Sequence, residues 1–308
     1  MYSVAIKKPP ALNPGDRIRL VAPASPFDKR KLARGCRIIE RMGFVPVVDR
    51  REFSRRGFLA GDDQARASRL RRALLEDDSQ AVWCIRGGYG SARLLEKIDL
   101  AGIMARPKLL IGFSDITALL LPISAPGGFV TIHGPVVTQL PELSANTLQW
   151  LKKLICGTQP AGRVPLGKLK TLVRGKTKGF LVGGNLSVFT SLLGTPHLPP
   201  LAGAILYLED VAELAYRLDR MLVQLGQSGA IKNVFGVVLG SLTKCKPAGR
   251  TRYSARSVLE RAVAELGIPA VSGAAIGHQR RNLALPNGIL ASLDADRGVL
   301  ELLEPAVR

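Results

Sequence analysis

One serine stands where a reactive hydroxyl is often found, between an apolar run and the start of a helix. The run Lys108–Gly112 is followed by Phe113, Ser114 and Asp115. A serine becomes a nucleophile when a turn exposes it and a base takes its proton, and the N–H groups at a helix start stabilise a developing oxyanion. Ser114 is therefore a candidate nucleophile. Ile116 replaces the last glycine of the G-x-S-x-G pattern of α/β-hydrolases, and a helix-capping serine is the alternative interpretation.

Three histidines are available as the base, and their surroundings differ. His197 lies in a proline-bound loop, which favours a structural role. His133 ends an apolar run and fits a buried core position as well as a catalytic one. His278 follows a glycine just past a short apolar segment, which favours a ring exposed on a loop. We therefore prefer His278 to His133, although the residues alone leave both open.

A carboxylate that orients the imidazole and stabilises its charged form would complete a catalytic triad. Glu209 follows the apolar run Ala204–Leu208, which predicts a place at the carboxyl end of a strand, where the sites of parallel sheets collect. Asp210 and Glu213 are close enough to be alternatives. They could instead cap the following helix or pair with the arginines along it.

A glycine-rich loop, Arg86-Gly87-Gly88-Tyr89-Gly90, follows another apolar run. Glycines after a strand allow backbone N–H groups to approach a ligand or bind an anion. The spacing is not that of the G-x-G-x-x-G dinucleotide pattern, which also requires an acidic residue about 20 positions further on. The loop is a candidate ligand-binding segment, with a tight turn as the alternative.

Alternating strand-like and helix-like segments must position these residues. In the first half, strands are predicted over Arg17–Ala24, Phe44–Val48, Ala81–Ile85 and Lys108–Gly112, and helices over Lys29–Met42, Asp62–Leu75 and Asp115–Leu121. This alternation predicts an α/β fold with a mostly parallel, helix-covered sheet. Ser114 and the glycine-rich loop would then both lie at the carboxyl ends of strands.

A change in composition divides the chain. Residues 151–200 contain eight Lys/Arg and no Asp or Glu. Apolar runs resume afterwards, at Ala204–Leu208, Val234–Leu239 and Ile289–Leu293, with a helix predicted over Ala215–Leu225. We predict a nucleophile-bearing domain over 1–160, a basic linker over 161–180, and a smaller α/β domain over 181–308 that carries Glu209 and His278.

The overall charge is the feature that most suggests a nucleic-acid partner. The 308 residues carry 44 Lys/Arg and 24 Asp/Glu, a net charge of +20. Such charge concentrates polyanions but defines no site, and with aromatic residues at 5% and no nucleic-acid-binding motif, we expect no nucleic-acid partner. The four cysteines are scattered, which predicts free thiols and no metal site. No run reaches the ~18 apolar residues of a membrane span, so we expect a soluble, cytoplasmic protein.

Together these motifs resemble the LD-carboxypeptidase family of serine peptidases, which also holds the microcin C self-immunity peptidases. The resemblance covers nearly the whole chain, in order. Its motifs are Gly15-Asp16, Val21–Pro26, Phe58–Asp62, Arg86–Ser91, Gly112–Thr117, His133–Pro135, Gly183–Leu186, Leu208–Asp210, Tyr216–Leu222 and Gly277-His278. The resemblance implies a flavodoxin-like N-terminal domain, a smaller C-terminal α/β domain and an active site between them.

The resemblance also implies roles for the candidate residues. Ser114 would be the nucleophile, His278 the general base and Glu209 the acid that orients the imidazole. The chain departs from the family pattern in three places. Ala212 and Leu214–Ala215 replace the glycine and the proline often found after the Glu-Asp pair, and Asn287 stands where an aliphatic residue is usual. These departures leave the triad intact and bear on substrate preference.

By the same resemblance, the backbone N–H of Asp115 and that of Gly87 or Gly88 would form the oxyanion hole. The substrate's terminal carboxylate needs a cation, and we expect Arg86 to supply it and Tyr89 also to contact the substrate. The implied reaction is release of the terminal D-alanine from murein tetrapeptides in cell-wall recycling, through an acyl-enzyme. It needs no metal or cofactor, and the family implies a homodimer. The alternatives are cleavage of an aminoacyl-nucleotide analogue, as in microcin immunity, and a basic nucleic-acid-binding protein.

Overall fold

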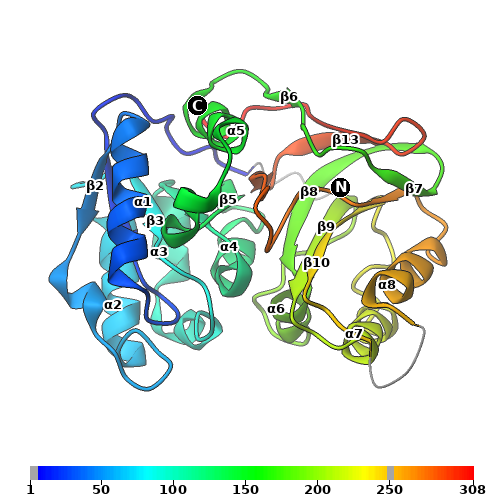
Figure 1. Ribbon diagram of the computed structural model, residues 1–308, viewed down its shortest axis with the longest axis horizontal. Helices are drawn as coiled ribbons and strands as arrows, with labels where there is room; N and C mark the ends of the chain where they lie inside the picture. The colour runs from blue at the N-terminus through cyan, green and yellow to red at the C-terminus, as the bar shows by residue number, and fades with distance from the viewer. Residues whose placement is uncertain (1–5, 248–252) are drawn as a thin grey trace.

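Two β-sheets with helices packed against them make up the protein in a computed structural model, which describes residues 6–247 and 253–308 (Figure 1). The strands of the first sheet are β1 (Arg17–Val21), β2 (Val45–Val48), β3 (Ala81–Cys84), β4 (Leu109–Gly112), β5 (Thr131–His133) and β12 (Leu285–Asn287). Their order is β12-β5-β4-β3-β1-β2, and β12 alone runs antiparallel to its neighbour. The order β2-β1-β3-β4-β5 is that of flavodoxin-like folds, which confirms the predicted N-terminal architecture.

Helices cover both faces of this sheet. They are α1 (Lys29–Arg41), α2 (Asp63–Leu75), α3 (Leu100–Ala105), α4 (Thr117–Ile123) and α5 (Ala145–Cys156), with short 3₁₀ segments η1 (Arg50–Phe53), η2 (Ala92–Lys97), η3 (Ser114–Ile116) and η4 (Val137–Glu142). The first two long helices begin as the sequence predicts. Asp28 accepts a hydrogen bond from the backbone N–H of Lys31 at 2.8 Å, and Asp62 accepts one from Ala65 at 2.7 Å.

The second sheet has eight strands. They are β6 (Gly162–Arg163), β7 (Lys170–Val173), β8 (Lys176–Asn185), β9 (Ala204–Val211), β10 (Gly236–Thr243), β11 (Ala270–Ser272), β13 (Leu290–Asp294) and β14 (Val299–Leu302), in the order β6-β14-β13-β8-β9-β10-β11-β7. The four central strands, β8 to β11, are parallel, and the flanking strands are antiparallel to their neighbours. Helices α6 (Leu186–Ser191), α7 (Ala215–Gln227) and α8 (Ala255–Ala264) pack on one face (Figure 1).

Two segments differ from their predicted place. Residues 161–180, predicted as a basic linker, contribute β6, β7 and the first half of β8 to the second sheet. Residues 285–287, predicted within the C-terminal domain, return to the first sheet as β12. The boundaries at 160 and 181 stay a prediction.

Buried side chains form two hydrophobic clusters, and each cluster extends across both sheets. In one, α1 and α5 pack on the first sheet, and the same cluster continues over β9, β13 and β14. In the other, the apolar faces of α2 and α4 join those of α6, α7 and α8. The two sheets are therefore held together by continuous apolar packing. Within the described residues, no helix is long and apolar enough to cross a membrane.

Candidate active site

A sharp turn at the end of β4 presents Ser114. The strand ends at Gly112, and Ser114 opens the 3₁₀ turn that leads into α4. Ser114 has φ +63°, in the left-handed region that costs a residue with a side chain about 1–2 kcal/mol. A Cβ at Gly112 would lie 2.7 Å from the side chain of Ile116, so the tight turn also requires the glycine. The turn leaves Ser114 partly exposed between two buried neighbours, Phe113 and Asp115.

Three side chains from both sheets meet at this serine. His278 Nε2 lies 3.0 Å from Ser114 Oγ, and His278 Nδ1 lies 2.8 Å from Glu209 Oε2. Glu209 comes from β9, and His278 follows β11. In the tautomer with a proton on Nδ1, the ring donates to Glu209 and accepts from the serine hydroxyl. The arrangement matches the nucleophile, base and orienting acid of a catalytic triad.

The environment of Glu209 fixes its orientation. Its side chain is fully buried, and Asn185 Nδ2 donates to Glu209 Oε1 at 3.3 Å. Gly277 has φ +101°, and a Cβ there would overlap the Glu209 carboxylate. The glycine before His278 is thus needed so that the backbone can approach the acid closely. The His278 side chain, predicted as a ring exposed on a loop, is only 20% exposed.

The neighbouring acids have other partners. Asp210 accepts hydrogen bonds from Ser187 N at 3.0 Å and Ser187 Oγ at 2.6 Å, so it binds the first turn of α6. Burial raises the pKa of Asp210, opposed by these hydrogen bonds. Glu213 pairs with Arg217 at 3.7 Å, one of the two alternatives that the sequence left open. Of the three candidate acids, only Glu209 contacts a histidine.

The other two histidines lie away from Ser114 Oγ. His197 Nε2 is 2.8 Å from Glu96 Oε1 at the surface. His133 is fully buried, and among the described residues neither of its ring nitrogens has a hydrogen-bond partner. Its ring packs edge-on against Phe113 and Tyr207, with centroids 5.9 and 5.3 Å apart. Burial lowers the pKa of His133 to about 4.

The glycine-rich loop packs directly against the serine. A Cβ at Gly87 would lie 3.0 Å from Ser114 Cβ, and one at Gly88 would overlap Ser25 Oγ. Asp115 Oδ2 accepts the Ser91 N–H at 2.8 Å, which ties the end of the loop to the serine turn. In the part of the chain that the structure describes, the N–H groups of Gly87, Gly88 and Asp115 have no hydrogen-bond acceptor. These N–H groups remain available to an oxyanion.

The two predicted substrate contacts lie at the outside of this loop. Arg86 is exposed, and its guanidinium donates to the carbonyl of Pro26 at 2.5 Å. The Tyr89 ring is 54% exposed and contacts Phe58, with centroids 5.5 Å apart. Within the described residues, neither side chain is hydrogen-bonded to Ser114, His278 or Glu209.

Sequence reasoning gave no role to three polar residues that support the site. Asn185 bonds Glu209 and also Asp210, at 3.1 Å. Thr117 Oγ1 accepts the Asn185 N–H at 3.1 Å, and Asn282 Oδ1 accepts the Gly277 N–H at 2.8 Å. The sequence does contain a signal for one of these residues. Asparagine between a strand and a helix is a typical N-cap, and Asn185 caps α6.

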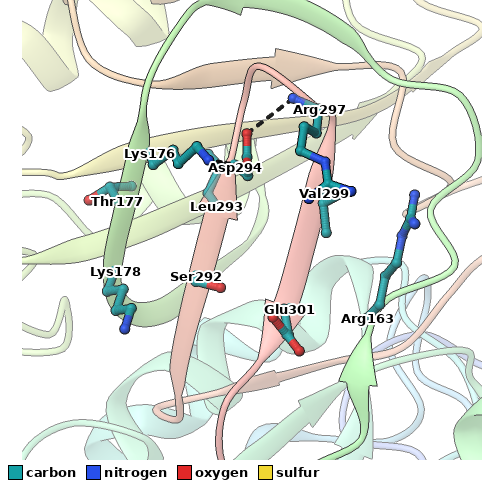
Figure 2. Close-up of a pocket in the computed structure, with 10 residues that line it drawn as sticks. All are labelled: Arg163, Lys176, Thr177, Lys178, Ser292, Leu293, Asp294, Arg297, Val299 and Glu301. Carbon is teal, nitrogen blue, oxygen red and sulfur yellow. Dashed lines mark hydrogen bonds and ion pairs between the residues drawn. The ribbon is translucent and has the colours of Figure 1, made fainter.

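A separate hollow lies on the second sheet and accounts for part of the basic charge. It has a volume of about 590 Å³ and is lined by four cations, Arg163, Lys176, Lys178 and Arg297, beside acidic and polar side chains of β13 and β14 (Figure 2). Lys176 pairs with Asp294 at 3.0 Å. No triad residue lines this hollow. Over residues 6–247 and 253–308, no three His, Cys, Asp or Glu side chains are grouped as metal ligands would be.

Comparison with known proteins gives consistent matches over both halves. Residues 18–134 match the model of the LD-carboxypeptidase N-terminal domain, and residues 178–293 match that of the LD-carboxypeptidase C-terminal domain. A probable murein peptide carboxypeptidase of Bacillus subtilis is 37% identical over 291 residues, 93% of this chain and 91% of the relative. A murein tetrapeptide carboxypeptidase of Pseudomonas aeruginosa is 36% identical over 296 residues, 91% and 94% of the two chains.

Solved structures share the fold. The muramoyltetrapeptide carboxypeptidase of Oxalobacter formigenes has a TM-score of 0.79 at 28% identity, covering 93% of this chain and 97% of that one. MccF, in complex with glutamyl sulfamoyl guanosine, has a TM-score of 0.89 at 22% identity, covering 98% and 99%. At that identity, the similarity to MccF shows the fold alone.

Proposed function

The chain belongs to the LD-carboxypeptidase family and is a peptidase, and from that premise we propose that it releases the terminal D-alanine of murein tetrapeptides in cell-wall recycling. The observation that carries the mechanism is the hydrogen-bonded series from Ser114 Oγ through His278 to Glu209, with distances of 3.0 and 2.8 Å. The names of the two murein carboxypeptidase relatives support the substrate.

The proposed reaction proceeds in two steps. Ser114 Oγ attacks the carbonyl of the L-configured centre of the diamino acid while His278 takes its proton. His278 then gives this proton to the leaving amine of D-alanine, which breaks the amide bond and leaves an ester on Ser114. Water attacks the ester with His278 again as base, and Ser114 is regenerated. Glu209 holds the imidazole tautomer and stabilises the imidazolium throughout.

The tetrahedral intermediates place a negative charge on the former carbonyl oxygen. We assign the N–H of Asp115, together with that of Gly87 or Gly88, to bind it. Two observations support this assignment: Gly87 packs on Ser114, and the Ser91–Asp115 hydrogen bond holds the two segments together. Because the donors are fixed before the charge develops, they need no reorganisation during the reaction. Arg86 is the proposed partner of the substrate's terminal carboxylate.

The decisive experiment follows D-alanine release from a defined muropeptide by mass spectrometry. Ser114→Ala is expected to lower the rate at least ~10³-fold. Ser191→Ala is the matched control, since Ser191 is exposed and its hydroxyl bonds only the Val188 carbonyl, at 2.7 Å. Full activity of Ser114→Ala would disprove the proposal. Faster hydrolysis of an aminoacyl adenylate than of the tetrapeptide by the wild type would favour the microcin-type alternative.

Two further proposals concern the state of the protein in the cell. We infer that the enzyme acts in the cytoplasm, because muropeptides released from the cell wall are recycled there. Cell fractionation tests this location. The homodimer implied by the family stays a prediction that light scattering can test. The charge of +20 is compatible with gathering carboxylate-rich peptides. Micromolar DNA binding with a steep salt dependence would instead support a nucleic-acid partner.

A further inference from the structure

Two exposed aromatic rings stand together beside the glycine-rich loop. Phe58 is 64% exposed and Tyr89 is 54% exposed. Their rings meet edge to face, with centroids 5.5 Å apart and planes at 66°. Single exposed apolar side chains are common on protein surfaces. A pair from two distant segments is a different feature, because it forms a continuous aromatic surface. We call Phe58 and Tyr89 the aromatic ledge.

The segment that carries Phe58 is held in place by its backbone. Arg56 N donates to Leu59 O at 2.9 Å, and Leu59 N donates to Arg56 O at 3.0 Å, which closes a tight turn around Phe58. The next residue, Ala60, donates its N–H to Ala24 O at 2.9 Å. The turn is thereby attached to the loop after β1.

The segment that carries Tyr89 is attached to the same loop. Tyr89 N donates to Ser25 Oγ at 3.1 Å. The fully buried guanidinium of Arg66 donates to the carbonyl of Gly90 at 2.9 Å and also to that of Pro23. A Cβ on Gly90 would overlap the side chain of Leu59, so the two segments are packed against each other. The two segments that carry the ledge are therefore both hydrogen-bonded to the loop after β1 and packed against each other.

The ledge also lies close to the nucleophile along the glycine-rich loop. Gly87 packs on Ser114, and Tyr89 is two residues further along. Consecutive Cα atoms are 3.8 Å apart, so the Tyr89 Cα is within roughly 8 Å of the Gly87 Cα. In a muropeptide, three residues separate the scissile carbonyl from the sugar, an extended span on the order of 10 Å. The sugar of a bound substrate can thus reach the ledge.

We propose that the aromatic ledge binds the sugar ring of N-acetylmuramoyl-linked tetrapeptides, so that the enzyme prefers sugar-linked to free peptide. A pyranose presents a face of C–H groups, and planar aromatic rings pack against such a face by burial and dispersion. This inference rests on the proposed function, because it concerns a part of the same substrate beyond the scissile bond. The ledge would bind the sugar at the end of the substrate opposite the terminal D-alanine, which the triad does not contact.

The test compares kcat/KM for two defined substrates, the free tetrapeptide and the same tetrapeptide carrying N-acetylmuramic acid. The wild type is expected to prefer the sugar-linked substrate. Phe58→Ala is expected to reduce that preference about tenfold, the change that corresponds to roughly 60 Å² of apolar surface left unburied. Phe58→Trp keeps a planar ring and should keep the preference, whereas Phe58→Leu should lose most of it.

Phe235→Ala is the matched control, because Phe235 is 50% exposed and lies beside β10 of the second sheet. It should leave the preference at its wild-type value, and a melting curve for each variant checks the fold. Equal kcat/KM for both substrates in the wild type, or an unchanged preference in Phe58→Ala, would overturn the ledge while leaving the proposed function standing. Failure of the wild type to cleave either tetrapeptide would overturn both proposals. If Phe58→Ala weakens the binding of an aminoacyl adenylate but leaves the preference between the two tetrapeptides unchanged, the ledge binds a nucleobase. The proposal that the ledge binds a sugar would then be wrong.

Discussion

Replacing His133 by phenylalanine is expected to make the protein more resistant to mild acid without removing its activity. His133 is fully buried between Phe113 and Tyr207 and has no hydrogen-bond partner among the described residues. Burial lowers the pKa of His133 from 6.5 to about 4. The unfolded chain therefore binds more protons than the folded one between these two values. Stability is fully present above pH 6.5 and is lost as the pH falls toward 4.

The size of the effect follows from the same two values. The difference between 6.5 and about 4 corresponds to about 3 kcal/mol over the whole interval, and to at most about 1.4 kcal/mol per pH unit within it. Phenylalanine is larger than histidine, and overpacking costs about 1–3 kcal/mol. That cost is the same at every pH, so the slope of stability against pH is the diagnostic quantity.

Urea unfolding followed by tryptophan fluorescence measures this slope. The protein has two tryptophans, Trp83 and Trp150, and both are buried. The free energy of unfolding of the wild type should fall more steeply from pH 6.5 to 4.5 than that of His133→Phe. Other titrating groups are common to both proteins and cancel in the comparison. Parallel curves would show that His133 does not stay neutral in the fold, and would refute the reasoning.

Activity measured on the same proteins tests which histidine is the base. His133→Phe should keep D-alanine release within a few-fold of wild type, because no hydrogen bond joins His133 to Ser114 in the described part of the chain. His278→Ala should lose at least ~10³-fold. Equal losses in the two variants would mean that the assignment of His278 as the base is wrong.

The remaining predictions concern the acid, the serine turn and the link between the sheets. Glu209→Gln should lower kcat for D-alanine release by about 10³–10⁴-fold with an unchanged circular dichroism spectrum, while Glu213→Gln, at a half-buried acid that pairs with Arg217 and contacts no histidine, should stay near wild type. Ser114→Gly should be as inactive as Ser114→Ala but about 1 kcal/mol more stable in urea unfolding, because glycine accepts φ +63° without strain. Asn287→Leu should destabilise the protein by about 2–5 kcal/mol, since the Tyr207 hydroxyl and the Gly183 N–H both lose their acceptor; adding Tyr207→Phe should recover part of that loss.

The sequence sufficed to predict four strands of the N-terminal sheet, β1 to β4, because they are short apolar runs that alternate with helices. Ala81–Cys84 and Leu109–Gly112 are buried at every residue, as a parallel strand covered on both faces requires. Because parallel strands carry their sites at their carboxyl ends, the same pattern singled out Ser114. The choice between His133 and His278 could not be made from residues alone. It depends on which ring is hydrogen-bonded to the serine and which is fully buried against Tyr207, and that is a property of packing.

Two segments differ from their predicted place for physical reasons. The composition of residues 161–180, which are rich in lysine and glycine, predicts a linker. In β8, however, Lys176 and Lys178 lie on the exposed face while Gly179 and Leu181 are buried, which is the alternation of a strand with one face in water. The three residues of β12 contain Pro286, which argues against a central strand. Strand β12 lies at the edge of the first sheet and pairs only with β5, a position where proline is tolerated. Because β12 and β5 are about 150 residues apart in the sequence, their pairing leaves no local sequence signal.

The departure at Asn287 bears on the alignment of the triad more directly than on substrate preference. Asn287 is fully buried in β12 of the first sheet, yet its Oδ1 accepts the Tyr207 hydroxyl at 2.7 Å and the Gly183 N–H at 3.0 Å, both from the second sheet. Tyr207 and Glu209 are two residues apart on β9, so their side chains share one face of the strand.

The hydrogen bonds of Asn287 therefore join β9 to the first sheet two residues along the strand from Glu209. Ser114 belongs to the first sheet and Glu209 to the second, and catalysis tolerates little error in their alignment. An aliphatic residue at position 287 would have to fix the same register by packing alone. In this chain a buried, directional polar contact joins the two sheets close to the place where Ser114 and Glu209 approach each other through His278.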